Sequence, residues 1–88
     1  MALSGHEIVV SSVDVTAGQI KALGAGCPTG KYPLGGGFTF NGPCEVRASA
    51  PRITGGGSPH GDGWIAEVKN TDSITRTLQV FVICAEEV

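Results

Sequence analysis

The chain has 88 residues, which is room for one domain, and a chain of this size hides only roughly 60 to 65 % of its unfolded surface on folding. Its formal net charge is −2 and its six lysines and arginines are scattered, so it has no basic stripe for a phosphate backbone. No apolar run approaches the roughly 20 residues that cross a bilayer. We predict a single domain, residues 1–88, that binds neither nucleic acid nor membrane. Its thin core favours stabilisation by a disulfide, by oligomerisation or by docking on a larger surface.

The first half of the chain reads as short strands separated by turns. Fourteen glycines and five prolines leave no stretch in which an apolar helical period could run for several turns. Residues 7–15 are rich in β-branched side chains and residues 19–26 alternate loosely, with a turn at 16–18. A turn at 27–30 leads to a strand at 32–40, and a reversal at 41–43 leads to a strand at 44–50.

The second half begins with clustered glycines and prolines at 51–63, which predict an exposed loop. Residues 64–69 then alternate as a half-buried antiparallel strand does, with Trp64, Ala66 and Val68 on one side. The last strand, 74–85, becomes apolar on both sides from Val80 to Cys84, which predicts a central strand or one covered by a neighbouring subunit. The fold class is therefore all-β: a small antiparallel β-sandwich or barrel of about six to eight short strands.

The three cysteines, Cys27, Cys44 and Cys84, are widely spaced and form no C-x-x-C motif. A thiolate zinc site and a dithiol redox site are therefore not expected. One disulfide with one leftover thiol is the simplest count, and three reduced cysteines packed as small apolar groups is the alternative.

Nothing in the sequence predicts catalysis. Residues 24–31 look like a phosphate-binding loop, but Ala25 and Tyr32 stand where that motif needs Gly and Ser or Thr. His6 and His60 have no metal ligand at suitable spacing, and no serine lies in a nucleophile elbow. We predict no enzymatic activity, no cofactor and no metal.

Trp64, directly after the long loop, is the first candidate for stacking on a sugar face, and Tyr32 is the second. The alternative is that Trp64 is the largest filler of the core. The three glycines at 35–37 could line a ligand cleft, or they could mark a bulge and leave room for an aromatic ring such as Trp64.

Several motifs together resemble a small β domain found in actinobacteria and their phages, where it often follows collagen-like repeats. They are Cys-Pro-Thr-Gly-Lys at 27–31, Leu-Gly-Gly-Gly at 34–37 and Val-Ile-Cys-Ala at 82–85. The resemblance implies a β-sandwich-like structural or adhesive module without catalysis, with Cys27 and Cys84 as the bonded pair. Cys44 is not part of that pattern, which leaves the pairing open.

The resemblance and the absence of a signal peptide lead to a functional expectation: a phage capsid decoration protein, made in the host cytoplasm and fixed to the virion exterior. Its partner would be the major capsid protein or a fibre, and it would form a homotrimer. The termini, residues 1–7 and 86–88, are candidates for docking. The alternative is a receptor- or glycan-binding tip of a phage fibre or of an actinobacterial collagen-like surface protein. In that case the candidate contacts to a cell-surface glycan are Tyr32, Arg52, His60 and Trp64.

Overall fold

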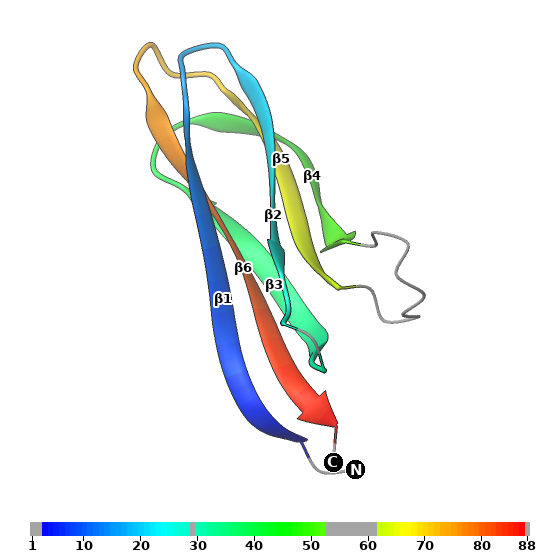
Figure 1. Ribbon diagram of the computed structural model, residues 1–88. Helices are drawn as coiled ribbons and strands as arrows, with labels where there is room; N and C mark the ends of the chain where they lie inside the picture. Colours follow the sequence, from blue (N-terminus) through cyan, green and yellow to red (C-terminus); the bar gives the residue numbers. More distant parts are fainter. Residues whose placement is uncertain (1–2, 29, 53–61, 88) are drawn as a thin grey trace.

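The computed structural model describes residues 3–28, 30–52 and 62–87 and contains six antiparallel strands in these ranges (Figure 1). One sheet has the order β1-β6-β3 and the other the order β2-β5-β4. The strands are β1 (Leu3–Val15), β2 (Ile20–Gly26), β3 (Tyr32–Phe40), β4 (Cys44–Arg52), β5 (Gly63–Asn70) and β6 (Arg76–Glu87). The predicted all-β class is confirmed.

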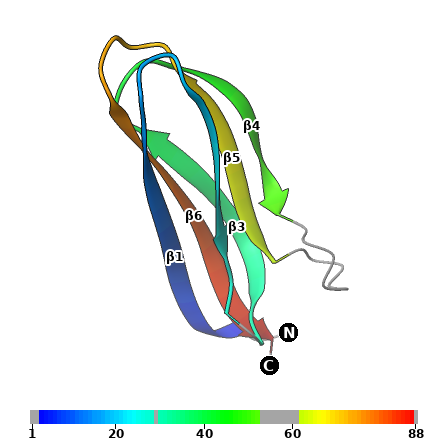
Figure 2. The same cartoon turned by 45° about the horizontal axis from the view of Figure 1, so that its top comes forward.

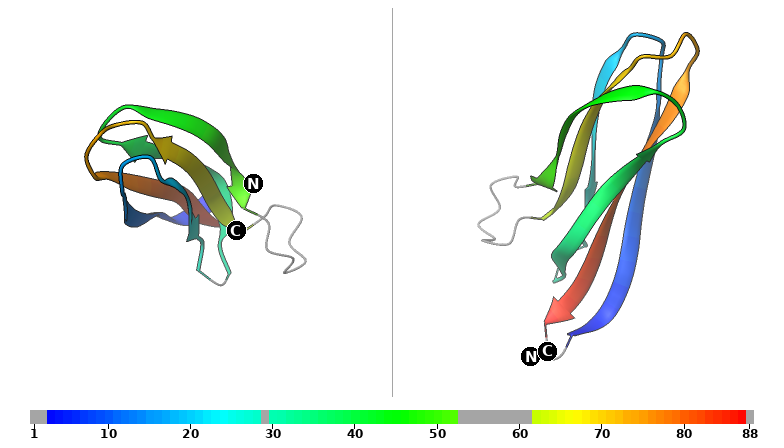
Figure 3. Two further views of the ribbon diagram at one scale, coloured as in Figure 1. Left: turned by 90° about the horizontal axis from the view of Figure 1, so that it is seen from above. Right: turned by 180° about the vertical axis from the view of Figure 1, so that it is seen from behind.

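The two sheets lie one over the other as two layers, seen from above in Figure 3 (left), and the molecule is about 47 Å long but only 16 Å thick. Small and β-branched side chains fill the space between the layers, because alternate residues of each strand point inward. The fully buried hydrophobic residues are Val15, Ala25, Ala66, Val68, Leu78, Val80, Val82, Cys84 and Ala85. The core is as thin as the composition suggests.

Strand β6 is the central strand of its sheet, as its apolar run predicts, and it pairs with β1 on one side and β3 on the other. Its inward residues Val80, Val82 and Cys84 are fully buried. Its outward residues Phe81 and Ile83 are only half-buried. One face of the apolar run is thus explained by the core. The other face of β6 lies on the surface of the molecule.

Most expected strand boundaries hold within two residues, and two differences have a clear cause. Strand β1 begins at Leu3 rather than at residue 7, because its first residues pair with the end of β6 across an irregularity between Ser4 and Glu7. Strand β6 begins at Arg76 rather than at Ile74, because the buried side chain of Asn70 donates a hydrogen bond to the Ile74 carbonyl and holds it in the preceding turn.

The glycines of β3 mark a bulge and leave room for the Trp64 ring, as the structural alternative predicts. A bulge separates Pro33 from Gly35 in the pairing with β6. A Cβ added at Gly36 would lie 2.6 Å from Cγ of Trp64 and 2.5 Å from the Phe81 carbonyl oxygen. The glycine therefore lets the indole of Trp64 lie directly against the β3 backbone.

The end of the sandwich farther from the chain termini (Figure 2) is held together by hydrogen bonds of Asn70, and we call it the Asn70 end. The Asn70 amide donates to the carbonyls of Val15 and Ile74, both at 2.9 Å, and its side-chain oxygen accepts from the Asp72 N–H. Its backbone bonds Gly18 and Gln19 of the β1–β2 turn. One fully buried polar residue thus connects two turns and both sheets.

Candidate functional site

The opposite end of the sandwich is closed by the disulfide Cys27–Cys84, and we call it the disulfide end. The two Cα atoms are 5.8 Å apart and the cysteines are separated by 57 positions in the chain. Cys27 directly follows β2 and Cys84 lies in β6, so the bond joins the two sheets covalently. This is the pairing that the resemblance implies. Cys44 is a free, half-buried thiol at the start of β4.

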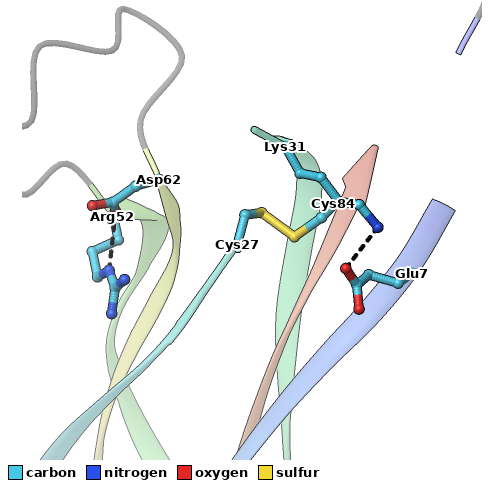
Figure 4. Close-up of a disulfide and its surroundings, with 6 residues drawn as sticks. All are labelled: Glu7, Cys27, Lys31, Arg52, Asp62 and Cys84. Carbon is cyan, nitrogen blue, oxygen red and sulfur yellow. Dashed lines mark hydrogen bonds and ion pairs between the residues drawn. A yellow bond between two sulfur atoms is a disulfide. The ribbon is translucent and has the colours of Figure 1, made fainter. Parts of the chain in front are cut away.

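Two ion pairs flank the disulfide (Figure 4). On one side Lys31 Nζ lies 2.7 Å from a Glu7 carboxylate oxygen, which connects β1 with the residue before β3. On the other side Arg52 Nε donates to the Asp62 carboxylate at 3.0 Å. Both pairs are partly exposed, so each contributes little stability by itself.

Arg52 and Asp62 join the end of β4 to the start of β5. The Asp62 N–H donates to the Arg52 carbonyl at 2.8 Å, and the Asp62 carbonyl accepts from the Cys27 N–H at 2.7 Å. The Arg52 side chain crosses the sheet and lies against Gly24 and Gly26; an added Cβ would collide with its guanidinium group at Gly26 and would be in tight contact with the side chain at Gly24. Arg52 therefore covers a glycine-lined part of the outer face, and its side chain is hydrogen-bonded to the Asp62 carboxylate.

Trp64 of β5 is partly buried against the core, beside Gly36 of β3 and Pro51 of β4. Its Nε1 donates to the hydroxyl of exposed Ser49 at 3.0 Å. Next to it is a small hollow of about 70 Å³, which is lined by Pro33, Leu34, Gly35, Pro51 and Trp64. The side chains that line the hollow are apolar, and one of them, Leu34, is 50 % exposed.

The candidate contact residues do not converge on one site. Trp64 points inward. Arg52 pairs with Gly63, the residue before Trp64, and because successive residues of a strand point to opposite faces, Arg52 lies on the outer face of the sheet. Tyr32 belongs to the other sheet, where it pairs with Ala85. Cys84, the residue before Ala85, points its sulfur inward, so Tyr32 lies on the outer face of that sheet. His60 lies outside the described residues.

A surface that the sequence reasoning missed lies on the outer face of the β1-β6-β3 sheet. Ile8 pairs with Ile83 and Val10 with Phe81, so four large apolar side chains form one patch, which we call the apolar strip. Ile8 is 64 % and Val10 56 % exposed. Residues 7–15 carry apolar side chains on both faces of the strand, and this signal could have revealed the apolar strip, because a strand with one face in water should be polar on that face.

A larger and more polar hollow, of about 260 Å³, lies at the Asn70 end and is lined by Thr39, Phe40, Asn41, Thr77 and Gln79. Its polar groups bond one another: the Thr77 N–H donates to Asn41 Oδ1 at 2.8 Å, and the Thr77 hydroxyl donates to Asp14 at 3.1 Å. Throughout the described residues every buried side-chain polar atom has a partner. No orphaned group there waits for a ligand.

Three of the carboxylates each lie beside a different arginine. Asp62 pairs with Arg52, Glu67 with Arg47 and Asp72 with Arg76. The hydrogen bond from Arg76, with one from the Ser73 N–H, holds the pKa of Asp72 below its ordinary value. These carboxylates lie far apart along the sandwich and act as ion-pair partners.

The described residues contain no group of three or more side chains that could hold a metal ion. They also contain no helix that is long and apolar enough to cross a membrane. Comparison with protein-family models, with curated proteins and with solved structures gave no match.

Proposed function

We propose that this chain is a non-enzymatic structural protein of a virion, a capsid decoration protein that binds the outside of a phage head. Its partner is the major capsid protein, and its contacts hold neighbouring capsomers together. Many weak contacts on a repeating lattice sum to a stable shell, so a small module with a modest contact surface suits this task. The homotrimer expected for such a protein is the alternative to the dimer proposed below, and the mass of the protein in solution distinguishes the two.

The observation that carries the proposal is the apolar strip on a covalently joined scaffold. Ile8 and Val10 are more than half exposed and lie beside Phe81 and Ile83 of the central strand. Contiguous exposed apolar side chains are typical of protein contact surfaces. In the described part of the chain, Asp62, Glu67 and Asp72 are bonded to arginines and Glu7 to Lys31, and no group of three or more side chains could hold a metal ion.

The test uses purified protein and heads of an actinobacterial phage that encodes it, prepared with and without the protein. We expect saturable rebinding to the bare heads, measured by co-sedimentation, and restored resistance to heat and osmotic shock. Protein unfolded by reduction and urea is the control for nonspecific adsorption. Bare heads that neither bind the chain nor lose resistance without it would contradict the proposal.

A second candidate function, glycan binding by a fibre tip or a surface protein, is favoured by the hollow beside Trp64. An indole edge next to exposed Leu34 and two prolines offers an apolar surface for a sugar ring. Titration with actinobacterial wall polysaccharide should then shift the Trp64 fluorescence. Leu34→Lys should abolish the shift, whereas Ile74→Lys, at a similarly exposed position in a distant turn, should preserve it. An unchanged spectrum of the unmodified chain would exclude this function for the polysaccharide tested.

A further inference from the structure

Strand β1 has an unpaired backbone edge. It is 13 residues long, lies at the border of the β1-β6-β3 sheet, and pairs with β6 along one side (Figure 1). No other described strand pairs with its second side. The N–H and C=O groups along that side are therefore available to another strand.

The other three border strands carry features that discourage such pairing. Strand β3 has Pro33 and a bulge, and β4 has Pro51 and a bulge between Val46 and Ala48. Strand β2 is seven residues long and contains Lys21 and two glycines. Proline, bulges, charge and short length are the usual means by which proteins protect a sheet edge.

Strand β1 lacks these features over its middle. Residues 8–13 read Ile-Val-Val-Ser-Ser-Val, without charge, proline or glycine. The one irregularity of β1 lies nearer its start, between Ser4 and Glu7. Such a segment has the composition of a strand that pairs with another strand.

We propose that β1 pairs antiparallel with β1 of a second copy of this chain, in a register centred on Val9, so that the two three-stranded sheets become one sheet of six. The proposal concerns self-association and does not depend on binding to a capsid. Because the two edges are identical and face each other across a two-fold axis, the contact closes at two copies and leaves no free β1 edge.

The register follows from the side chains on the outer face. With Val9 at the centre, Ile8 lies opposite the partner's Val10, and the apolar strips of both copies join into one. A shift to a centre at Val10 would place Ile8 opposite the partner's Ser12, and a centre at Ser11 would place it opposite the partner's Asp14. The register centred on Val9 is thus the one that places the two exposed large apolar side chains of β1, Ile8 and Val10, beside apolar partners.

The first experiment is light scattering on a sizing column across a range of protein concentrations. The unmodified chain should have twice the chain mass of 9.0 kDa. Ile8→Lys should give a monomer that still unfolds cooperatively, because Ile8 is exposed within one copy, and its unfolding temperature should no longer depend on protein concentration. The matched control is Ile20→Lys on the border strand of the other sheet, where Ile20 is 48 % exposed, and it should remain a dimer.

A second experiment tests the register. Ile8→Lys and Val10→Glu chains, each monomeric by itself, should form a heterodimer when mixed, because the introduced lysine lies opposite the introduced glutamate. An unmodified chain that is monomeric at its solubility limit, or that forms a trimer, would overturn the proposal. So would a dimer that Ile8→Lys leaves intact and Ile20→Lys dissociates.

Discussion

The two ends of the sandwich are held together by different means. At the disulfide end a covalent bond joins β2 to β6, and the surrounding ion pairs are partly exposed. At the Asn70 end one fully buried amide joins the turns by hydrogen bonds. A covalent link restricts the unfolded chain, whereas a buried amide stabilises the folded state only while its partners are in place. The two ends should therefore respond differently to mutation and to reducing conditions.

The largest expected effect is loss of the disulfide. Cys27→Ser with Cys84→Ser should lower the free energy of unfolding by about 4 kcal/mol, because the bond closes a long loop in the unfolded chain. Urea unfolding followed by Trp64 fluorescence measures it. Cys44→Ser is the matched control and should cost less than about 1 kcal/mol. Equal losses in both variants would mean that the bond contributes little at this end.

The next effect is at the Asn70 end. Asn70→Ala should lower the free energy of unfolding by about 3 kcal/mol, because it removes two hydrogen bonds donated to carbonyls and one accepted from the Asp72 N–H in a buried site. Asn41→Ala, which removes a single exposed hydrogen bond to the Thr77 N–H, should cost less than about 1 kcal/mol. The loss in Asn70→Ala should be the same with and without reductant. A loss that appears only after reduction would show that the two ends are not independent.

Packing between the ends can be tested at the β3 glycines. Gly36→Ala should cost about 2 kcal/mol, because the new Cβ would collide with Trp64 and with the Phe81 carbonyl. Gly35→Ala should be close to neutral, because no atom lies within 4 Å of the position that its Cβ would take. Thermal unfolding of the two variants side by side gives the difference. Equal stabilities would contradict the described contact between Gly36 and Trp64.

The smallest effect concerns pH at the Asn70 end. Arg76 lowers the pKa of Asp72 in the folded protein, so the ion pair stabilises the fold above the unfolded pKa of about 4 and this contribution is lost as pH falls through the folded pKa. The stability difference between the unmodified chain and Asp72→Asn should be largest near neutral pH and shrink in acid. High salt should reduce it at neutral pH. A difference that grows in acid would mean that the shift has the opposite sign.

The sequence predicted the fold class well because glycine and proline separate the strands so clearly. Strand β3 was predicted at its observed boundaries, since turn residues bound it on both sides. The sheet order was not predictable, because β1 pairs with β6 across nearly the whole chain. Asn70 lies in a cluster of turn residues, where asparagine is normally exposed, so its burial could not be expected. The Cys27–Cys84 pairing came from the resemblance, while the cysteine spacing left it open.

The candidate site was less predictable than the fold. Tyr32, Arg52 and Trp64 were chosen by residue type, but the pairing of the strands sends them to different faces. The apolar residues on both faces of residues 7–15 hint at the apolar strip, but only the pairing of β1 with β6 shows that Ile8 and Val10 lie beside Ile83 and Phe81. Surfaces of this kind depend on the order of the strands in the sheet, and the pattern of apolar and polar residues along the sequence does not determine that order.

The central claim is that the β1 edge and the apolar strip beside it form an assembly surface. Amide hydrogen exchange at low and high protein concentration tests it most directly. We predict that the alternate amides of residues 8–13 that point away from β6 gain protection as concentration rises, while those of the bulged border strand β4 do not. Exchange in β1 that is independent of concentration, or protection that appears in β4 instead, would contradict the claim.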